Sequence, residues 1–141
     1  GDDRDTGVSH ADSLQSMVDD IHQRNVQAGW WHDLRTGEPL DRNVGELLCL
    51  VHSEISEAME GHRKSKGSAC MMDDKLPHRP MFEVEIADAL IRLFDLAGGL
   101  KRPDTGKSYD IPGALDEKLA YNAQRGDHKP ENRVKDGGKE Y

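Results

Sequence analysis

Apolar residues recur at helical spacing in four segments of the chain, and no segment shows the convincing alternation of a β-strand. Helix-start residues mark three of these segments: Asn43 with Glu46 three positions later, Pro80, and Asp110. Gly- and Pro-containing loops separate them. The predicted helices cover residues 13–28, 43–63, 80–100 and 110–125. Four helices joined by modest loops predict an all-α fold, an antiparallel four-helix bundle.

Polar segments flank the helical part of the chain. We expect residues 1–12 to form a flexible N-terminal segment and residues 127–141 a polar C-terminal tail. Residues 13–126 are then a single all-α domain, since a chain of 141 residues is long enough for one core but not for two.

Composition and charge exclude several classes of protein. The formal net charge of −8 argues against a general binder of nucleic-acid polymers, which needs clustered Lys and Arg to neutralise phosphates. Two cysteines, Cys49 and Cys70, are too few for a disulfide framework or a cysteine-based zinc site. No apolar run is long enough to span a membrane, and no signal-peptide pattern opens the chain. We therefore expect a soluble cytoplasmic protein without a membrane partner.

The second predicted helix carries acids beside the face that it needs to bury. In HSEISEAMEGHRK, residues 52–64, a turn of about 100° per residue places Glu54 inside the apolar arc. Glu57 falls at the border of that arc, and Glu60 falls outside it. Burying a carboxylate in an apolar face is costly unless the charge has a partner.

The third predicted helix repeats this layout. Glu85 lies inside its apolar arc, and Asp88 lies on the flank together with Arg92 and Asp95. An acidic pair at i, i+3 is by itself common on solvated helix surfaces. Two matched pairs on successive helices, however, converge if the apolar faces meet. Converging carboxylates repel strongly in a low dielectric, and a hard divalent cation such as Mg²⁺, or Mn²⁺ in its place, resolves the conflict.

Other metal chemistries fit less well. A di-iron helical bundle requires Glu-x-x-His motifs, and neither acidic pair has a histidine at the third following position.

The same residues resemble a known family. The pairs Glu54/Glu57 and Glu85/Asp88 resemble the ExxE…ExxD motif of the MazG-like, all-α nucleoside triphosphate pyrophosphohydrolases. The likeness extends over LLCLVHSEISEAMEGHRK and EVEIADALIRLFDLAG, and the later DEKLAYNAQR resembles the Lys-x-x-x-Asn segment of that group. Together these segments span residues 44–125. Ser53 stands where many members carry a further acid, and the loop between the two motifs is long for the family.

The resemblance implies a fold, a reaction and an assembly. The reaction is Mg²⁺-dependent hydrolysis of a (deoxy)nucleoside triphosphate to the monophosphate and pyrophosphate, which suits house-cleaning of the nucleotide pool. Four residues are implied as metal ligands and catalytic groups: Glu54, Glu57, Glu85 and Asp88. Lys118 and Arg125 are implied as phosphate contacts and Asn122 as a hydrogen-bond donor. The likeness also implies a homodimer or a homotetramer.

Several alternatives stay open at this level. Trp30 and Trp31 adjoin each other in a loop, so that one can plug the core or a subunit contact while the other stacks on a base. The motifs do not indicate which base or which sugar the substrate carries. The alternative function is a non-catalytic MazG-like module that binds a metal–nucleotide complex or a protein partner.

Overall fold

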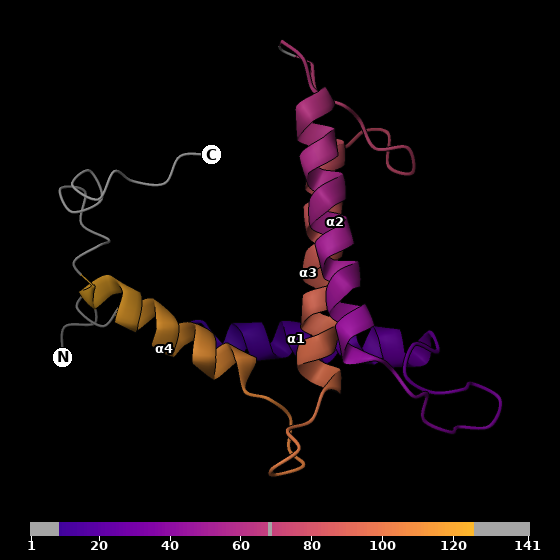
Figure 1. The fold of residues 1–141 in the computed structure, drawn as a ribbon, viewed down its shortest axis with the longest axis vertical. Coiled ribbons are helices and arrows are strands. Elements are labelled where there is room, and N and C mark those ends of the chain that lie inside the picture. The colour runs from indigo at the N-terminus through magenta and orange to yellow at the C-terminus, as the bar shows by residue number, and fades with distance from the viewer. Residues whose placement is uncertain (1–8, 68, 126–141) are drawn as a thin grey trace. The chain divides into compact units, whose positions relative to one another are not determined.

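Four helices make up the regular structure of the computed structural model, which describes residues 9–67 and 69–125 (Figure 1). Isolated β-bridges close several loops, but the described residues form no strand. The all-α prediction is confirmed, while the predictions for residues 1–8 and 126–141 lie outside the described residues. The helices are α1 (Ala11–Gln27), α2 (Val44–Lys64), α3 (Met81–Gly99) and α4 (Ile111–Gln124).

Local capping interactions explain where two helices begin. The side chain of Asn43 accepts a hydrogen bond from the backbone N–H of Glu46 over 3.0 Å, so Asn43 is the N-cap of α2 as predicted. Asp110 caps α4 in the same way, through the N–H of Gly113 over 2.9 Å. Pro80 is the residue before α3, not a member of its first turn, and it makes no side-chain cap.

Contacts divide the chain into two units, of which the larger covers residues 17–109. In this unit α2 and α3 run antiparallel along each other (Figure 1). Small residues allow the close approach: Ala58 and Ala89 are both only 2% exposed. A Cβ atom added to Gly61 would lie 3.0 Å from the Cγ atom of Met81. The α2–α3 hairpin is therefore the framework on which the two acidic motifs are carried.

The smaller unit joins residues 9–16 to residues 110–125. Here the Asp116 carboxylate of α4 accepts hydrogen bonds from the hydroxyl of Ser9 over 2.8 Å and from the backbone N–H groups of His10 and Ala11, each over 2.9 Å. The hydrogen bond from the His10 backbone is the main cause that lowers the pKa of Asp116. Asp116 thus satisfies N–H groups at the start of α1, where a negative charge is also favourable.

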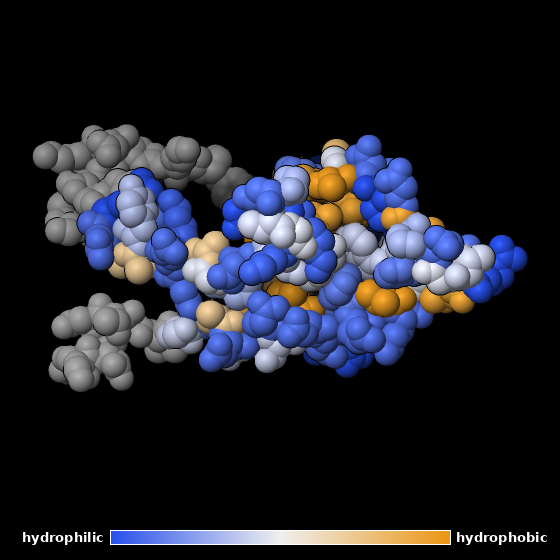
Figure 2. All heavy atoms as spheres, turned by 90° about the horizontal axis from the view of Figure 1, so that it is seen from below, coloured by the Kyte–Doolittle hydropathy of each residue, from blue (hydrophilic) through white to orange (hydrophobic). Residues whose placement is uncertain are grey.

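The buried apolar core is small for the number of apolar residues. It consists of Val18, Ala58, Ala89, Leu96 and Ala97 among the described residues. Larger side chains remain exposed along both helices of the hairpin, and apolar side chains are visible at the surface in Figure 2. On α2 these are Val44, Leu48, Ile55 and Met59, and on α3 they include Phe82, Leu90 and Leu93.

Candidate functional site

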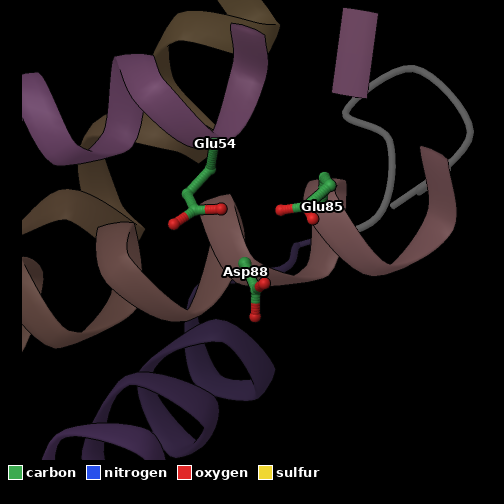
Figure 3. A group of neighbouring side chains, drawn as sticks. All are labelled: Glu54, Glu85 and Asp88. Atoms are coloured by element: carbon green, nitrogen blue, oxygen red, sulfur yellow. The ribbon is translucent and has the colours of Figure 1, made fainter. Parts of the chain in front are cut away.

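Three acidic side chains meet on the α2–α3 hairpin. Glu54 comes from α2, whereas Glu85 and Asp88 come from α3, and one carboxylate oxygen of each lies within 4.8 Å of those of the other two. In Figure 3 the carboxylates of Glu54 and Glu85 point toward one another. All three side chains are half-buried. The structure therefore brings together three of the four predicted ligands, which we call the acid cluster.

The acid cluster is electrostatically crowded. Burial, followed by a hydrogen bond shared with Glu54 and by the negative charges around it, raises the pKa of Glu85 to about 7. Burial and the charge of Glu54 also raise the pKa of Asp88, while the positive charge of Arg92 opposes this shift. The proton that Glu85 retains as the pH approaches 7 thus relieves part of this repulsion. A divalent cation would relieve it more completely, so the donor set fits a hard metal ion.

Glu57 does not join this group. Its side chain is exposed, and it contributes no oxygen atom to the acid cluster. Its negative charge is nevertheless one of the causes that raise the pKa of Glu85, so it lies within electrostatic reach. On the helical wheel Glu57 sits at the border of the face that α2 turns to α3, where the helix period alone does not decide between burial and exposure.

A pocket of about 300 Å³ adjoins the acid cluster. Glu54 and Asp88 belong to the acid cluster and also line this pocket. Two tryptophans, an amide and three cationic side chains contribute to its wall. These are Trp30, Trp31, Asn25, Arg42, Lys75 and Arg92. Aromatic, amide and cationic groups beside converging carboxylates suit a ligand that has a flat ring at one end and a polyanion at the other.

The cations of the pocket are held by specific contacts. Arg92 donates from Nε to Oε1 of Glu54 over 3.1 Å. Arg42 donates to the backbone carbonyl of Trp30 over 2.7 Å, and its guanidinium lies 6.0 Å from the centre of the Trp30 ring. Lys75 follows the buried Asp73, whose Oδ2 accepts the backbone N–H groups of Lys75 and Leu76 and so fixes the turn.

The two tryptophans are used differently. Trp31 donates its indole N–H to Oδ1 of Asp95 over 2.8 Å, and its ring lies edge-on to His22 with 5.4 Å between the ring centroids. Gly99 of α3 leaves room for this ring, because an added Cβ atom would collide with the Trp31 indole. Trp30, in contrast, is 43% exposed. Trp31 therefore anchors the loop, and Trp30 is the ring that remains accessible for stacking.

The remaining predicted residues lie on and just after α4, in the smaller unit. Lys118 Nζ lies 4.7 Å from the centre of the Tyr121 ring, and the Arg125 guanidinium carbon lies 5.8 Å from it. The side-chain oxygen of Asn122 is buried and has no hydrogen-bond partner within the described part of the chain.

Sequence reasoning did not select several residues of the pocket. Asn25, Arg42 and Lys75 carry no periodic or motif signal, because their places depend on tertiary contacts. Arg92 and Asp95 do carry a signal, since both share the flank of α3 with Asp88 on the helical wheel.

No family model, no curated protein and no solved structure matches the chain. The likeness to MazG-like proteins therefore depends on the motif residues themselves. Within residues 9–67 and 69–125, no helix is both long enough and apolar enough to cross a membrane.

Proposed function

We propose that the protein is a Mg²⁺-dependent pyrophosphohydrolase that converts (deoxy)nucleoside triphosphates to monophosphates and pyrophosphate. The observation that carries the proposal is the acid cluster at the edge of a pocket lined by cations and an accessible tryptophan. The likeness of both motif helices to the MazG-like group supplies the reaction, and a role in cleaning the nucleotide pool follows from it.

The metal ligands of this proposal are the members of the acid cluster. Glu54, Glu85 and Asp88 would hold Mg²⁺, or Mn²⁺ as a substitute, and Glu57 is near enough to act on the cluster through its charge. When bound, such an ion neutralises phosphate charge and lowers the pKa of a coordinated water. After burial, the carboxylates around Glu85 contribute to raising its pKa, which supports this choice because a cation would neutralise their charge.

The other residues bind and orient the nucleotide. The accessible face of Trp30 suits stacking on a base, and Asn25 offers an amide that both donates and accepts hydrogen bonds. Lys75 and Arg92 place positive charge beside the acid cluster, where a triphosphate would lie. In the MazG-like reading, Lys118, Asn122 and Arg125 add phosphate contacts, and one carboxylate orients the attacking water.

Self-association completes the bundle in this proposal. Val44, Leu48, Ile55 and Met59 follow one another at helical spacing on α2 and are exposed, and α3 adds Phe82, Leu90 and Leu93. Two copies of the hairpin that pack these exposed apolar residues against each other would form an antiparallel four-helix bundle. The assembly would be a homodimer or half of a homotetramer. Ile55→Glu should then lower the mass measured by light scattering to that of the monomer. An unchanged mass would contradict this interface.

Product analysis tests the reaction. The protein is incubated with Mg²⁺ and a panel of ribo-, deoxyribo- and modified nucleoside triphosphates, beside the variants Asp88→Ala and Glu83→Gln. Monophosphate plus pyrophosphate, lost in Asp88→Ala and retained in Glu83→Gln, supports the proposal, because Glu83 is an exposed acid of the same helix. Diphosphate plus orthophosphate would contradict it. Nucleotide binding without turnover would favour the alternative, a non-catalytic module that holds a metal–nucleotide complex.

A further inference from the structure

Arg92 already neutralises one member of the acid cluster. Its Nε atom lies 3.1 Å from Oε1 of Glu54, and the two side chains are 30% and 14% exposed. The other Arg–carboxylate pairs in the described part of the chain are at least 38% exposed on both sides. Unlike those pairs, Arg92 and Glu54 also join two different helices. This ion pair is therefore built into the site and is not a feature of the solvated surface.

The same carboxylate would have to serve a divalent cation. Arg92 binds Glu54 and follows Asp88 by one helical turn on α3, so its guanidinium and a cation in the acid cluster would share the Glu54 carboxylate. Two positive centres that share one carboxylate repel each other. Uptake of a divalent cation thus weakens the hold of Glu54 on Arg92.

A released guanidinium has a second anion to bind. Arg92 lines the pocket together with Lys75, on the side where Glu54 and Asp88 also contribute to the wall. Its planar fork of donors matches phosphate oxygens, which it contacts in pairs better than a lysine does. No large displacement is needed, because the side chain is in the pocket already.

We propose that Arg92 is an exchangeable counter-ion of Glu54. It neutralises Glu54 in the metal-free protein, and it transfers to the polyphosphate of the nucleotide when the acid cluster takes up its cation. This inference rests on the proposed function and adds to it a coupling between the binding of the cation and the binding of the polyphosphate. Because cation and polyphosphate each relieve the charge that the other leaves unpaired, each raises the affinity for the other.

A purely structural role for Arg92 predicts the opposite change in metal affinity when Arg92 is removed. If the guanidinium serves only to orient Glu54 for the metal, its removal weakens metal binding. If it is an exchangeable counter-ion, its removal strengthens metal binding and weakens polyphosphate binding. The two readings are separated by binding measurements alone, without turnover.

The experiment titrates Mn²⁺ into the full chain by calorimetry, first alone and then with inorganic tripolyphosphate as the anion probe. The wild type is compared with Arg92→Gln and with Arg79→Gln, which removes an exposed arginine from the same hairpin. Arg92→Gln should bind Mn²⁺ about fivefold more tightly. It should bind tripolyphosphate in the presence of Mn²⁺ about tenfold more weakly. Arg79→Gln should behave as the wild type.

Each other outcome has a distinct meaning. Weaker Mn²⁺ binding by Arg92→Gln, or unchanged tripolyphosphate binding, overturns the exchange while the proposed function stands. Absence of Mn²⁺ binding and of turnover in the wild type overturns the proposed function and the exchange together. Should Arg92→Gln fail to fold, the Nε–H signal of Arg92 in the ¹⁵N NMR spectrum of the wild type decides, with Arg92→Lys for its assignment. A signal that does not move at saturating Mg²⁺ overturns the exchange.

Discussion

Trp31 and His22 donate to the same oxygen atom of Asp95, over 2.8 Å and 2.7 Å. The shared acceptor connects α1, the loop after it and α3 at a single buried point, since Asp95 is 8% exposed. Trp30, the residue before Trp31, takes no part in this contact; both tryptophans line the pocket, but Trp30 is 43% exposed. Trp31 thus contributes a buried structural contact, whereas the neighbouring Trp30 ring stays largely exposed.

The two tryptophans should therefore respond differently to mutation. Trp31→Phe removes the indole donor from a buried carboxylate and should lower the free energy of unfolding by about 1–3 kcal/mol. Trp30→Phe, at an exposed site, should change it by about 0.5 kcal/mol or less. Urea unfolding of both variants provides the measurement. In nucleotide binding the order should reverse, with Trp30→Ala weakening affinity by about tenfold through lost stacking. Equal losses of stability in both phenylalanine variants would contradict this division.

Gly99 should not tolerate a side chain. Alanine is the better helix former by about 1 kcal/mol, yet a Cβ atom at position 99 collides with the Trp31 indole. Gly99→Ala should therefore destabilise the protein by about 1–3 kcal/mol and change the near-UV circular dichroism of Trp31. Gly61→Ala is the matched control, because its nearest neighbour is the flexible Met81 side chain. A smaller loss is expected there, and a larger loss in the control would contradict the argument.

The raised pKa of Glu85 makes metal-free stability depend on pH. The native state holds this proton up to about pH 7, whereas the usual value for a glutamate is 4.5. Between these values the native state binds more protons than the unfolded state, so stability falls as pH rises from about 4.5 to about 7. With allowance for solvent screening the loss is about 1 kcal/mol. Urea unfolding at pH 5.5 and pH 8 in a chelating buffer measures it.

Glu85→Gln supplies the control for that measurement. The amide keeps the shape of the side chain but does not titrate, so the difference between the two pH values should shrink. An undiminished difference would place its origin elsewhere in the protein.

The acids of the first motif should differ in their effect on metal affinity. Glu54→Gln removes a member of the acid cluster and should reduce Mn²⁺ affinity by more than about 100-fold, beyond the loss typical of outer groups. Glu57→Gln removes only a nearby charge and should reduce it by about tenfold. Calorimetric titration of both variants tests this order. Equal losses would mean that Glu57 is a direct ligand.

The sequence predicted the parts of the molecule that obey local rules. The start of α2 at Asn43 follows from cap chemistry, and the convergence of Glu54 with Glu85 follows from the period of the helix. The exposure of Glu57 does not follow, because a residue at the border of an apolar face is buried or exposed according to how far the partner helix reaches. The place of Lys75 in the pocket could not be predicted for another reason. A turn stabilised by Asp73, which shows no periodic pattern in the sequence, brings Lys75 to the pocket.

The hydrogen bonds of Asp116 bear on the order in which the protein forms during synthesis. Asp116 follows Ala11 by 105 residues, so the N–H groups at the start of α1 leave the ribosome long before their acceptor exists. At roughly 5–20 residues per second, the delay is about 5–20 s. The α2–α3 hairpin is complete within that interval. We therefore expect the nascent chain to carry a formed hairpin and a first helix that is frayed at its N-terminal end until α4 arrives.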